Sequence, residues 1–272
     1  MNLKPSFLII GAQKAGTTAL FSYLSRHSQV IPPLEKELDF FSCEGRYRRG
    51  LDYYHTFFPR AEAQLLDAVT FEASPDYLLK PQAAGRIFEY NPDIKLIVIL
   101  RDPVKRAFSS WNMYVKCFDK NTNWFLDWMK RCDSAFDIGL LRRRKLSDFL
   151  DFEYVVREEI PFAERDELIE ATLLLHGKYA EQLNRYLNYF DRNRLLVIEH
   201  EELRQHTIET LNVVTRFLGI RNHPWANENL APVFEGDYQS EIPEAAKTML
   251  SQYYLEYNNT LFKMIERRYD WV

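Results

Sequence analysis

Residues 11–18, GAQKAGTT, have the composition of a loop that binds an anion through backbone N–H groups. They lie between the apolar run at residues 6–10, typical of a buried strand, and residues 17–26, which have apolar side chains at helical spacing. The start of a helix attracts anions, and glycine lets a phosphate approach the backbone closely. Only nine of the 272 residues are glycine. Gly11 and Gly16 in one short segment therefore favour a phosphate- or sulfate-binding loop over an ordinary turn with an exposed lysine.

The residues of this loop predict which groups would touch the anion. Lys14 can reach its terminal oxygens, and the hydroxyl groups of Thr17 and Thr18 can donate hydrogen bonds. The candidates for binding a cofactor here are Gln13, Lys14, Ala15, Gly16, Thr17 and Thr18. The pattern GxxxxGK[ST] puts its lysine directly after the second glycine, where this chain has Thr17. No predicted strand ends in a lone aspartate placed for Mg²⁺, so the pattern argues against kinase or ATPase chemistry and for transfer of a group that needs no metal.

A second candidate for anion binding follows the most apolar run of the chain, KLIVIL at residues 95–100. Arg101 directly follows this predicted central strand, at the carboxyl edge where α/β sheets bind ligands. Ser109 lies about two helical turns further on, in a helix that begins near Pro103. The arginine can bind a phosphate dianion through bidentate hydrogen bonds, with Ser109 facing the same anion. Taken alone, Arg-Asp-Pro could equally be an ion pair at the start of a helix.

Buried strands alternate with helices along the chain, which predicts how these residues are positioned. We expect strands at residues 6–10, 69–72, 95–100 and 195–198, and helices at 17–26, 82–90, from Pro103 onward, 168–190, 207–218 and 243–265. This alternation is typical of an α/β, three-layer, P-loop-type fold with a central parallel sheet flanked by helices. Since no linker divides the chain, we expect one domain over residues 1–272, with an irregular insertion at about 119–153.

The loop at residues 11–18 resembles the 5′-phosphosulfate loop of sulfotransferases that use 3′-phosphoadenosine 5′-phosphosulfate (PAPS). The sequence Leu-Arg-Asp-Pro at 100–103, with Ser109, is similar to the 3′-phosphate site of that family. The resemblance implies a PAPS-dependent sulfotransferase that moves the sulfuryl group to a hydroxyl acceptor by in-line displacement, yields PAP and requires no metal. It also implies that Arg101 and Ser109 anchor the cofactor, and that Lys14 stabilises charge on the sulfuryl oxygens.

Residues 35–41, EKELDFF, resemble the segment that carries the catalytic base in heparan-sulfate-type sulfotransferases. That family has a glutamate two residues before His or Gln, followed by Phe-Phe. The match assigns the base to Glu37 and puts Asp39 at the His/Gln position, which departs from the family pattern. Such a base would take the proton of the acceptor hydroxyl as it attacks sulfur. Without the resemblance, a solvated run of charged residues would explain the same segment.

A third segment resembles the family with one substitution. Residues 71–77, FEASPDY, are similar to its Glu-Lys-Ser/Thr-Pro segment near the acceptor, but Ala73 replaces the lysine. Together with Asp39, Glu72 and Ser74 are therefore the candidates for binding the acceptor, although Glu72 and Ser74 could simply end a strand.

The C-terminal part also resembles the family and departs from it at one point. Gly-Lys-Tyr at 177–179 is similar to a Gly-x-Tyr helix, which implies that Tyr179 lies near the nucleotide. Many members close the 3′-phosphate site with a Lys-Gly-Arg loop, whereas residues 234–240 contain no basic residue. We therefore expect this chain to close its nucleotide site differently, or to bind PAPS less tightly.

Charge and composition limit the partners and the compartment. The net charge of −4 argues against a general nucleic-acid binder. No apolar run reaches the length of a membrane span or of a signal peptide, and the three cysteines form no CxxC pair. We therefore expect a cytoplasmic enzyme with free thiols, from the bacterial branch of the family. The six histidines show no metal-binding spacing.

The acceptor is the least defined part of this interpretation. The heparan-type resemblance implies a carbohydrate hydroxyl, and the bacterial branch adds lipids and carrier-bound hydroxyacyl groups. Basic residues at Arg46, Arg48 and Arg49 and at 142–145 could bind an anionic acceptor or form a solvated surface. Two other functions stay open. One is a P-loop nucleoside or small-molecule kinase, which would need ATP and Mg²⁺, and the other is a catalytically silent module that binds PAP or another nucleotide.

Overall fold

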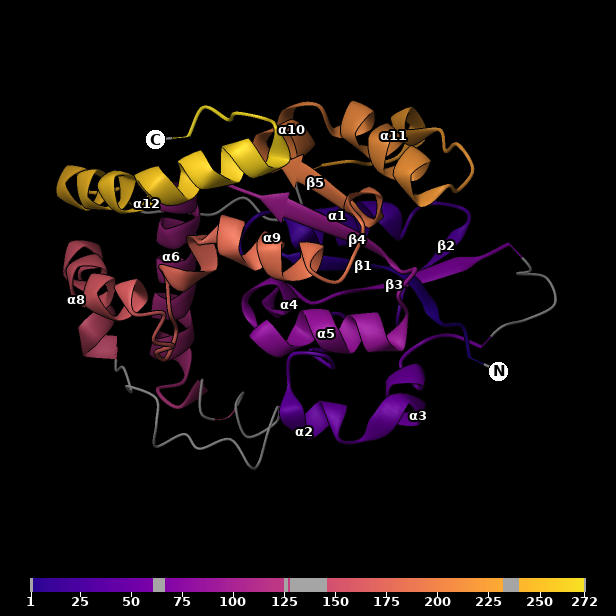
Figure 1. Ribbon diagram of the computed structural model, residues 1–272, viewed down its shortest axis with the longest axis horizontal. Coiled ribbons are helices and arrows are strands. Elements are labelled where there is room, and N and C mark those ends of the chain that lie inside the picture. The colour runs from indigo at the N-terminus through magenta and orange to yellow at the C-terminus, as the bar shows by residue number, and fades with distance from the viewer. Residues whose placement is uncertain (1, 61–66, 125–126, 128–145, 232–239, 272) are drawn as a thin grey trace. The chain divides into compact units, whose positions relative to one another are not determined.

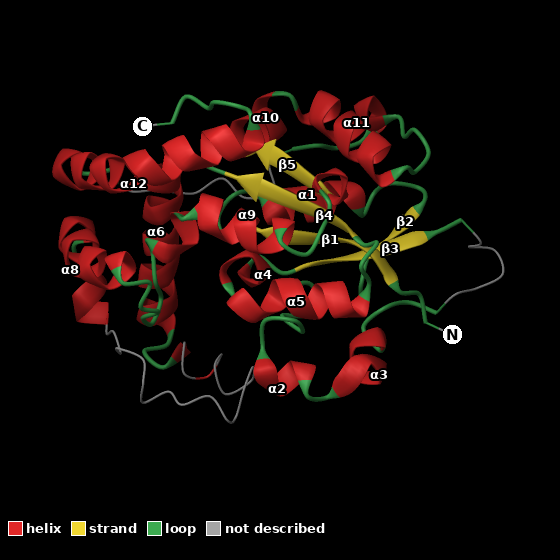
Figure 2. Cartoon of the chain, in the orientation of Figure 1, coloured by secondary structure: helices red, strands yellow, loops and turns green. Residues whose placement is uncertain are grey.

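The computed structural model describes residues 2–60, 67–124, 127, 146–231 and 240–271. The chain forms two compact units, one from Met1–Leu100 with Asn184–Glu235 and one from Arg101–Leu183 with Gly236–Val272. The first unit contains the sheet and the second is helical (Figures 1 and 2). A single domain over the whole chain stays a prediction.

The first unit is built on a five-stranded sheet of order β2-β3-β1-β4-β5 in which every pairing is parallel. The strands are β1 Pro5–Gly11, β2 Val30–Ile31, β3 Val69–Ala73, β4 Lys95–Leu100 and β5 Leu195–Glu199. Residues of β1 and β4 are almost all inaccessible to solvent, since both central strands are covered on two faces. The predicted α/β fold with a central parallel sheet and flanking helices is confirmed (Figure 2).

Helices flank this sheet and lie in the segments that follow its strands. They are α1 Thr17–Leu24, α2 Glu44–Tyr47, α3 Gly50–His55, α4 Asp76–Leu79, α5 Pro81–Tyr90, α10 His200–Gln205 and α11 Thr207–Leu218. The sequence predicts α1, α5 and α11 because each has a periodic apolar face. It misses β2, α2, α3, α4 and α10 because elements of two to six residues are too short to show a period.

The second unit is built from α6 Pro103–Lys120, α8 Phe152–Glu164 and α12 Glu244–Ile265. Helix α9, Tyr179–Leu187, begins in this unit and continues into the other. Most of the insertion expected at about residues 119–153 lies outside the described residues. Its described ends belong to α6, to the 3₁₀ turn Leu146–Phe149 and to the start of α8.

The long helix expected at residues 168–190 is wrong in its first half. The buried carboxylate of Glu159 accepts hydrogen bonds from the backbone N–H groups of Leu173 and Leu174, both at 2.7 Å. These bonds take the place of helical ones, so the chain stays irregular until a 3₁₀ turn at Leu175–Gly177. A Cβ atom at Gly177 would stand 2.6 Å from the hydroxyl of Tyr254. The turn can therefore pack this closely on α12 only because residue 177 is glycine.

Candidate active site

The anion-binding loop, residues 11–18, joins β1 to α1 as predicted. The N–H of Ala12 donates to the carbonyl of Ile99 at 2.8 Å, which ties the start of the loop to β4. Gly16 precedes α1 with φ of 100°, and Lys14 has φ of 64°. Such left-handed conformations curl a loop so that its N–H groups can turn inward. The predicted strand, loop and helix around residues 13–18 are therefore confirmed. Contacts of these residues with an anion stay a prediction.

Neighbouring elements hold the loop closely. A Cβ atom at Gly11 would stand 2.7 Å from Cβ of Leu78 and 3.1 Å from the carbonyl of Pro75, so only glycine fits. On the α10 side, Nδ1 of His200 lies 3.0 Å from the carbonyl of Ala15. Ala15 and Thr17 are buried, whereas Gln13, Lys14, Gly16 and Thr18 are half-buried and so partly accessible to a ligand.

Glu37 lies beside the same edge of the sheet. Its N–H donates to the carbonyl of Ala73, the last residue of β3, at 3.2 Å. Ala73 is in register with Ile9 of β1, and β1 ends at Gly11. The side chain of Glu37 is 52% exposed and its carboxylate contacts the ammonium of Lys36. The structure thus brings an accessible carboxylate to the strand ends where the anion-binding loop begins.

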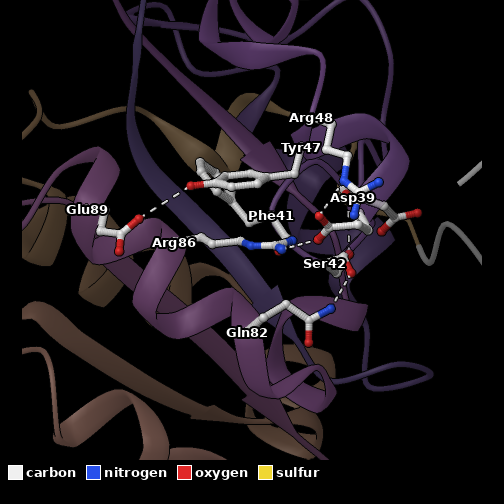
Figure 3. A network of polar contacts seen from close by, with 9 residues as sticks. Asp39, Phe41, Ser42, Tyr47, Arg48, Gln82, Arg86 and Glu89 are labelled. Atoms are coloured by element: carbon white, nitrogen blue, oxygen red, sulfur yellow. Dashed lines mark hydrogen bonds and ion pairs between the residues drawn. The ribbon is translucent and has the colours of Figure 1, made fainter. Parts of the chain in front are cut away.

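The Glu37 loop, residues 35–42, is fastened to α5. Gln82 donates to the carbonyl of Ser42 at 2.7 Å, and Arg86 donates to that of Phe41 at 3.2 Å (Figure 3). The hydroxyl of Ser42 in turn donates to the carbonyl of Asp39 at 3.2 Å. These bonds to backbone carbonyls fix the path of the loop while leaving the carboxylate of Glu37 accessible.

Glu72 and Ser74 do not reach the solvent. Both side chains are 0% exposed, and the carboxylate of Glu72 accepts hydrogen bonds from the hydroxyl groups of Tyr54, Ser74 and Tyr77, each at 2.6 Å. Burial raises the pKa of Glu72, and the three hydrogen bonds oppose that rise. Direct contact of either residue with an acceptor stays a prediction, but their burial and mutual bonding favour a supporting role.

Asp39 is buried among other carboxylates. Burial raises its pKa well above the usual range for aspartate, and the charges of Asp76, Glu37 and Glu72 raise it further, while Arg46 opposes the shift. Burial also raises the pKa of Asp76, against the opposing charge of Lys80. This edge of the sheet therefore holds protons to a higher pH than isolated carboxyl groups would.

We expect Asp39→Asn to stabilise the protein at neutral pH. The pKa of Asp39 is higher in the folded than in the unfolded chain. Between these two pKa values the folded state binds more protons than the unfolded state, so the free energy of unfolding falls as pH rises through this range. Asparagine removes this loss, and a gain of about 1 kcal/mol would raise Tm by about 2–4 °C. The gain should shrink as pH is lowered below the usual aspartate range, because Asp39 is then neutral in both states.

Thermal unfolding followed between acid and neutral pH measures this effect. Asp191→Asn is the matched control, because Asp191 is exposed in the same unit and its side chain caps no helix. A gain in Tm that is equal in both variants, or that appears only at acid pH, would contradict the assignment.

The remaining candidates lie in the second unit. Arg101 is half-buried and directly follows β4, and Asp102 caps α6 by accepting hydrogen bonds from Val104 at 2.8 Å and Lys105 at 3.2 Å. The hydroxyl of Tyr179 donates to the backbone carbonyl of Arg101 at 2.9 Å, and burial raises the pKa of Tyr179 to about 12. Tyr179 thus holds the backbone of Arg101. Ser109 is buried on α6.

Sequence reasoning missed several residues that shape this site. Tyr77 and Tyr54 bond to Glu72, and His200 contacts the anion-binding loop. Tyr77 stands in a segment already singled out for its chemistry. The contributions of Tyr54 and His200 depend on contacts between distant parts of the chain, so no local pattern reveals them.

In the part of the chain that the structure describes, no group of three or more His, Cys, Asp and Glu side chains is arranged to hold a metal ion. No described helix is long and apolar enough to cross a membrane.

Comparison with solved structures identifies proteins of the same fold. The sulfotransferase from Alicyclobacillus acidocaldarius matches with a TM-score of 0.70 and 25% identity, over 98% of this chain and 97% of that chain. The mouse sulfotransferase SULT7A1, solved in complex with PAP, matches with a TM-score of 0.50 and 11% identity, over 93% of this chain and 84% of that chain.

Sequence comparison gives the same result. Bifunctional heparan sulfate N-deacetylase/N-sulfotransferase 4 of Mus musculus is 28% identical over 97% of this chain, which spans 30% of that relative's length. A family model described as a sulfotransferase domain matches residues 4–239. Because this match covers most of the chain, it shows that the chain belongs to the sulfotransferase family.

Proposed function

We propose that this chain transfers the sulfuryl group of PAPS to a hydroxyl acceptor, with Glu37 as the general base. The observation that supports this best is the accessible carboxylate of Glu37, tied through Ala73 to the strand ends from which the anion-binding loop begins. The PAP bound by mouse SULT7A1, which shares the fold, supports PAPS as the cosubstrate.

The residues present fit such a cofactor. PAPS would supply a sulfuryl group attached to a phosphate, which is a good leaving group. The loop N–H groups and the ammonium of Lys14 would stabilise negative charge on the sulfuryl oxygens and on the departing phosphate. Arg101 and Ser109 would bind the 3′-phosphate, and Tyr179 would hold the backbone of Arg101 for that task.

The acceptor we propose is a carbohydrate, as the name of the heparan sulfate relative suggests. That name also describes an N-sulfotransferase, so a glycan amino group is a second candidate acceptor. Glu37 could take the proton from either nucleophile. Arg48 and Arg49 are exposed near the Glu37 loop, although Arg48 pairs with Glu44 and Arg49 lies over the ring of Tyr53. The basic run at 142–145 lies outside the described residues.

Thermal unfolding with PAP and with ATP·Mg²⁺ tests the proposed cofactor. A ligand that binds only the folded chain raises Tm, so PAP should stabilise the protein and ATP·Mg²⁺ should not. Arg101→Ala should lose most of the PAP-dependent rise. Arg157→Ala, which removes an exposed arginine of the same unit, should keep it.

Two outcomes would favour the other functions. Stabilisation by ATP·Mg²⁺ alone would indicate a kinase. Stabilisation by PAP without transfer of sulfate from PAPS to a panel of glycan, lipid and carrier-bound acceptors would indicate a silent nucleotide-binding module.

A further inference from the structure

A buried carboxylate, that of Glu72, lies beneath the Glu37 loop. It is 0% exposed, stands one residue before the end of β3, and accepts hydrogen bonds from three hydroxyl groups. A carboxylate buried in this way costs free energy that hydrogen bonds only offset. The three hydroxyl groups satisfy the carboxylate, and two of them also accept hydrogen bonds from the loop.

Those two hydroxyl groups link the carboxylate to the backbone of the loop. Ser74 accepts a hydrogen bond from the N–H of Asp39 at 2.9 Å, and Tyr77 accepts one from the N–H of Phe41 at 3.4 Å. Each hydroxyl proton is thus directed at Glu72, so each chain of bonds runs from backbone N–H through hydroxyl to carboxylate. This direction requires a hydrogen-bond acceptor at its end, and the carboxylate of Glu72 provides it.

The loop is therefore held at alternate residues. Glu37 is bonded to the carbonyl of Ala73, Asp39 to Ser74 and Phe41 to Tyr77. The partners all belong to the short segment that ends β3 and begins α4. Rotation of the loop about its own axis would break all three bonds, so they fix the direction in which the side chain of Glu37 leaves the backbone.

We propose that Glu72 is a positioning residue for Glu37. It touches no substrate, and it aligns the general base through the hydroxyl groups of Ser74 and Tyr77. This inference rests on the proposed function, in which Glu37 takes the proton of the acceptor. A displacement of the catalytic base by about 1 Å can lower a rate by about 10²-fold. We therefore expect the hydrogen bonds that run from the loop through Ser74 and Tyr77 to Glu72 to affect kcat more than the binding of PAPS.

Two single-hydroxyl deletions test the proposal as a matched pair. Ser74→Ala and Tyr54→Phe each remove one buried hydroxyl that donates to Glu72 over 2.6 Å. Of these two hydroxyl groups, that of Ser74 also accepts a hydrogen bond from the backbone of the Glu37 loop, whereas that of Tyr54 is not hydrogen-bonded to the backbone of this loop, which the structure describes in full. We expect both to lower Tm, since each deletes a hydrogen bond to a buried carboxylate. Ser74→Ala should in addition lower kcat by about 10- to 100-fold at an unchanged PAP dissociation constant, and Tyr54→Phe should leave kcat close to wild type.

Hydrogen exchange of residues 37–41 separates this inference from the proposed function. Ser74→Ala should speed amide exchange there and Tyr54→Phe should not, whether or not the protein transfers sulfate. Wild-type protein that binds PAP but transfers no sulfate would contradict the proposed function. The exchange data would still show whether Ser74 holds the Glu37 loop in place. Equal effects of the two variants on both kcat and exchange would overturn the positioning role. Tyr77→Phe, expected to behave like Ser74→Ala, serves if the latter does not fold.

Discussion

Glu37→Gln is expected to lower kcat by about 10²–10⁴-fold, the usual contribution of a general base. The amide has the size of the carboxylate but cannot take up the acceptor's proton. Since the side chain of Glu37 is 52% exposed, the substitution should leave the fold and Tm nearly unchanged. The measurement is kcat with saturating PAPS and acceptor, together with the PAP dissociation constant by calorimetry, which should not change.

Glu35→Gln is the control for this substitution. Glu35 is exposed in the same loop, so the variant removes an equal charge near the site without removing the proposed base. A Glu37→Gln enzyme with near-normal kcat would show that another group takes the proton. Equal losses in the two variants would indicate that the loop acts only through its overall charge.

Lys14→Ala is expected to lower kcat by about 10²–10³-fold, the usual loss when one donor to a developing negative charge is removed. Lys14 lies inside a loop whose start is tied to β4 and whose end leads into α1, so its ammonium is carried on a well-defined backbone. Lys4→Ala, at an exposed lysine just before β1, should keep full activity. If Lys14→Ala weakened PAP binding while kcat stayed normal, the lysine would anchor the cofactor and not stabilise the transition state.

Central strands were the most predictable part of the fold. Residues 95–100 form β4 with the same bounds as predicted, because an apolar run between polar ends is fully specified by its own composition. The helix expected at residues 168–190 fails for the opposite reason. Its first half has suitable residues, but Glu159 of another helix takes up the backbone N–H groups there, and no local pattern shows that competition.

The candidate site divides in a similar way. The loop at residues 11–18 and the segment at 35–41 could be found because their residues are contiguous and resemble known motifs. The burial of Glu72 and its bond to Tyr54 could not, since the two residues meet only when α3 packs near β3. The sequence therefore indicates the groups proposed to perform the chemistry, and only the fold shows what aligns them.

The raised pKa values at the carboxyl edge of the sheet also change how the protein's charge is counted. The formal net charge of −4 assigns a full negative charge to every aspartate and glutamate. Burial raises the pKa of Asp39 and of Asp76, so both retain protons to a higher pH than isolated aspartates do. Wherever their titration is incomplete, an incoming anion meets weaker repulsion than the sequence suggests, so a chain that is acidic overall can receive a polyanionic cofactor at this edge.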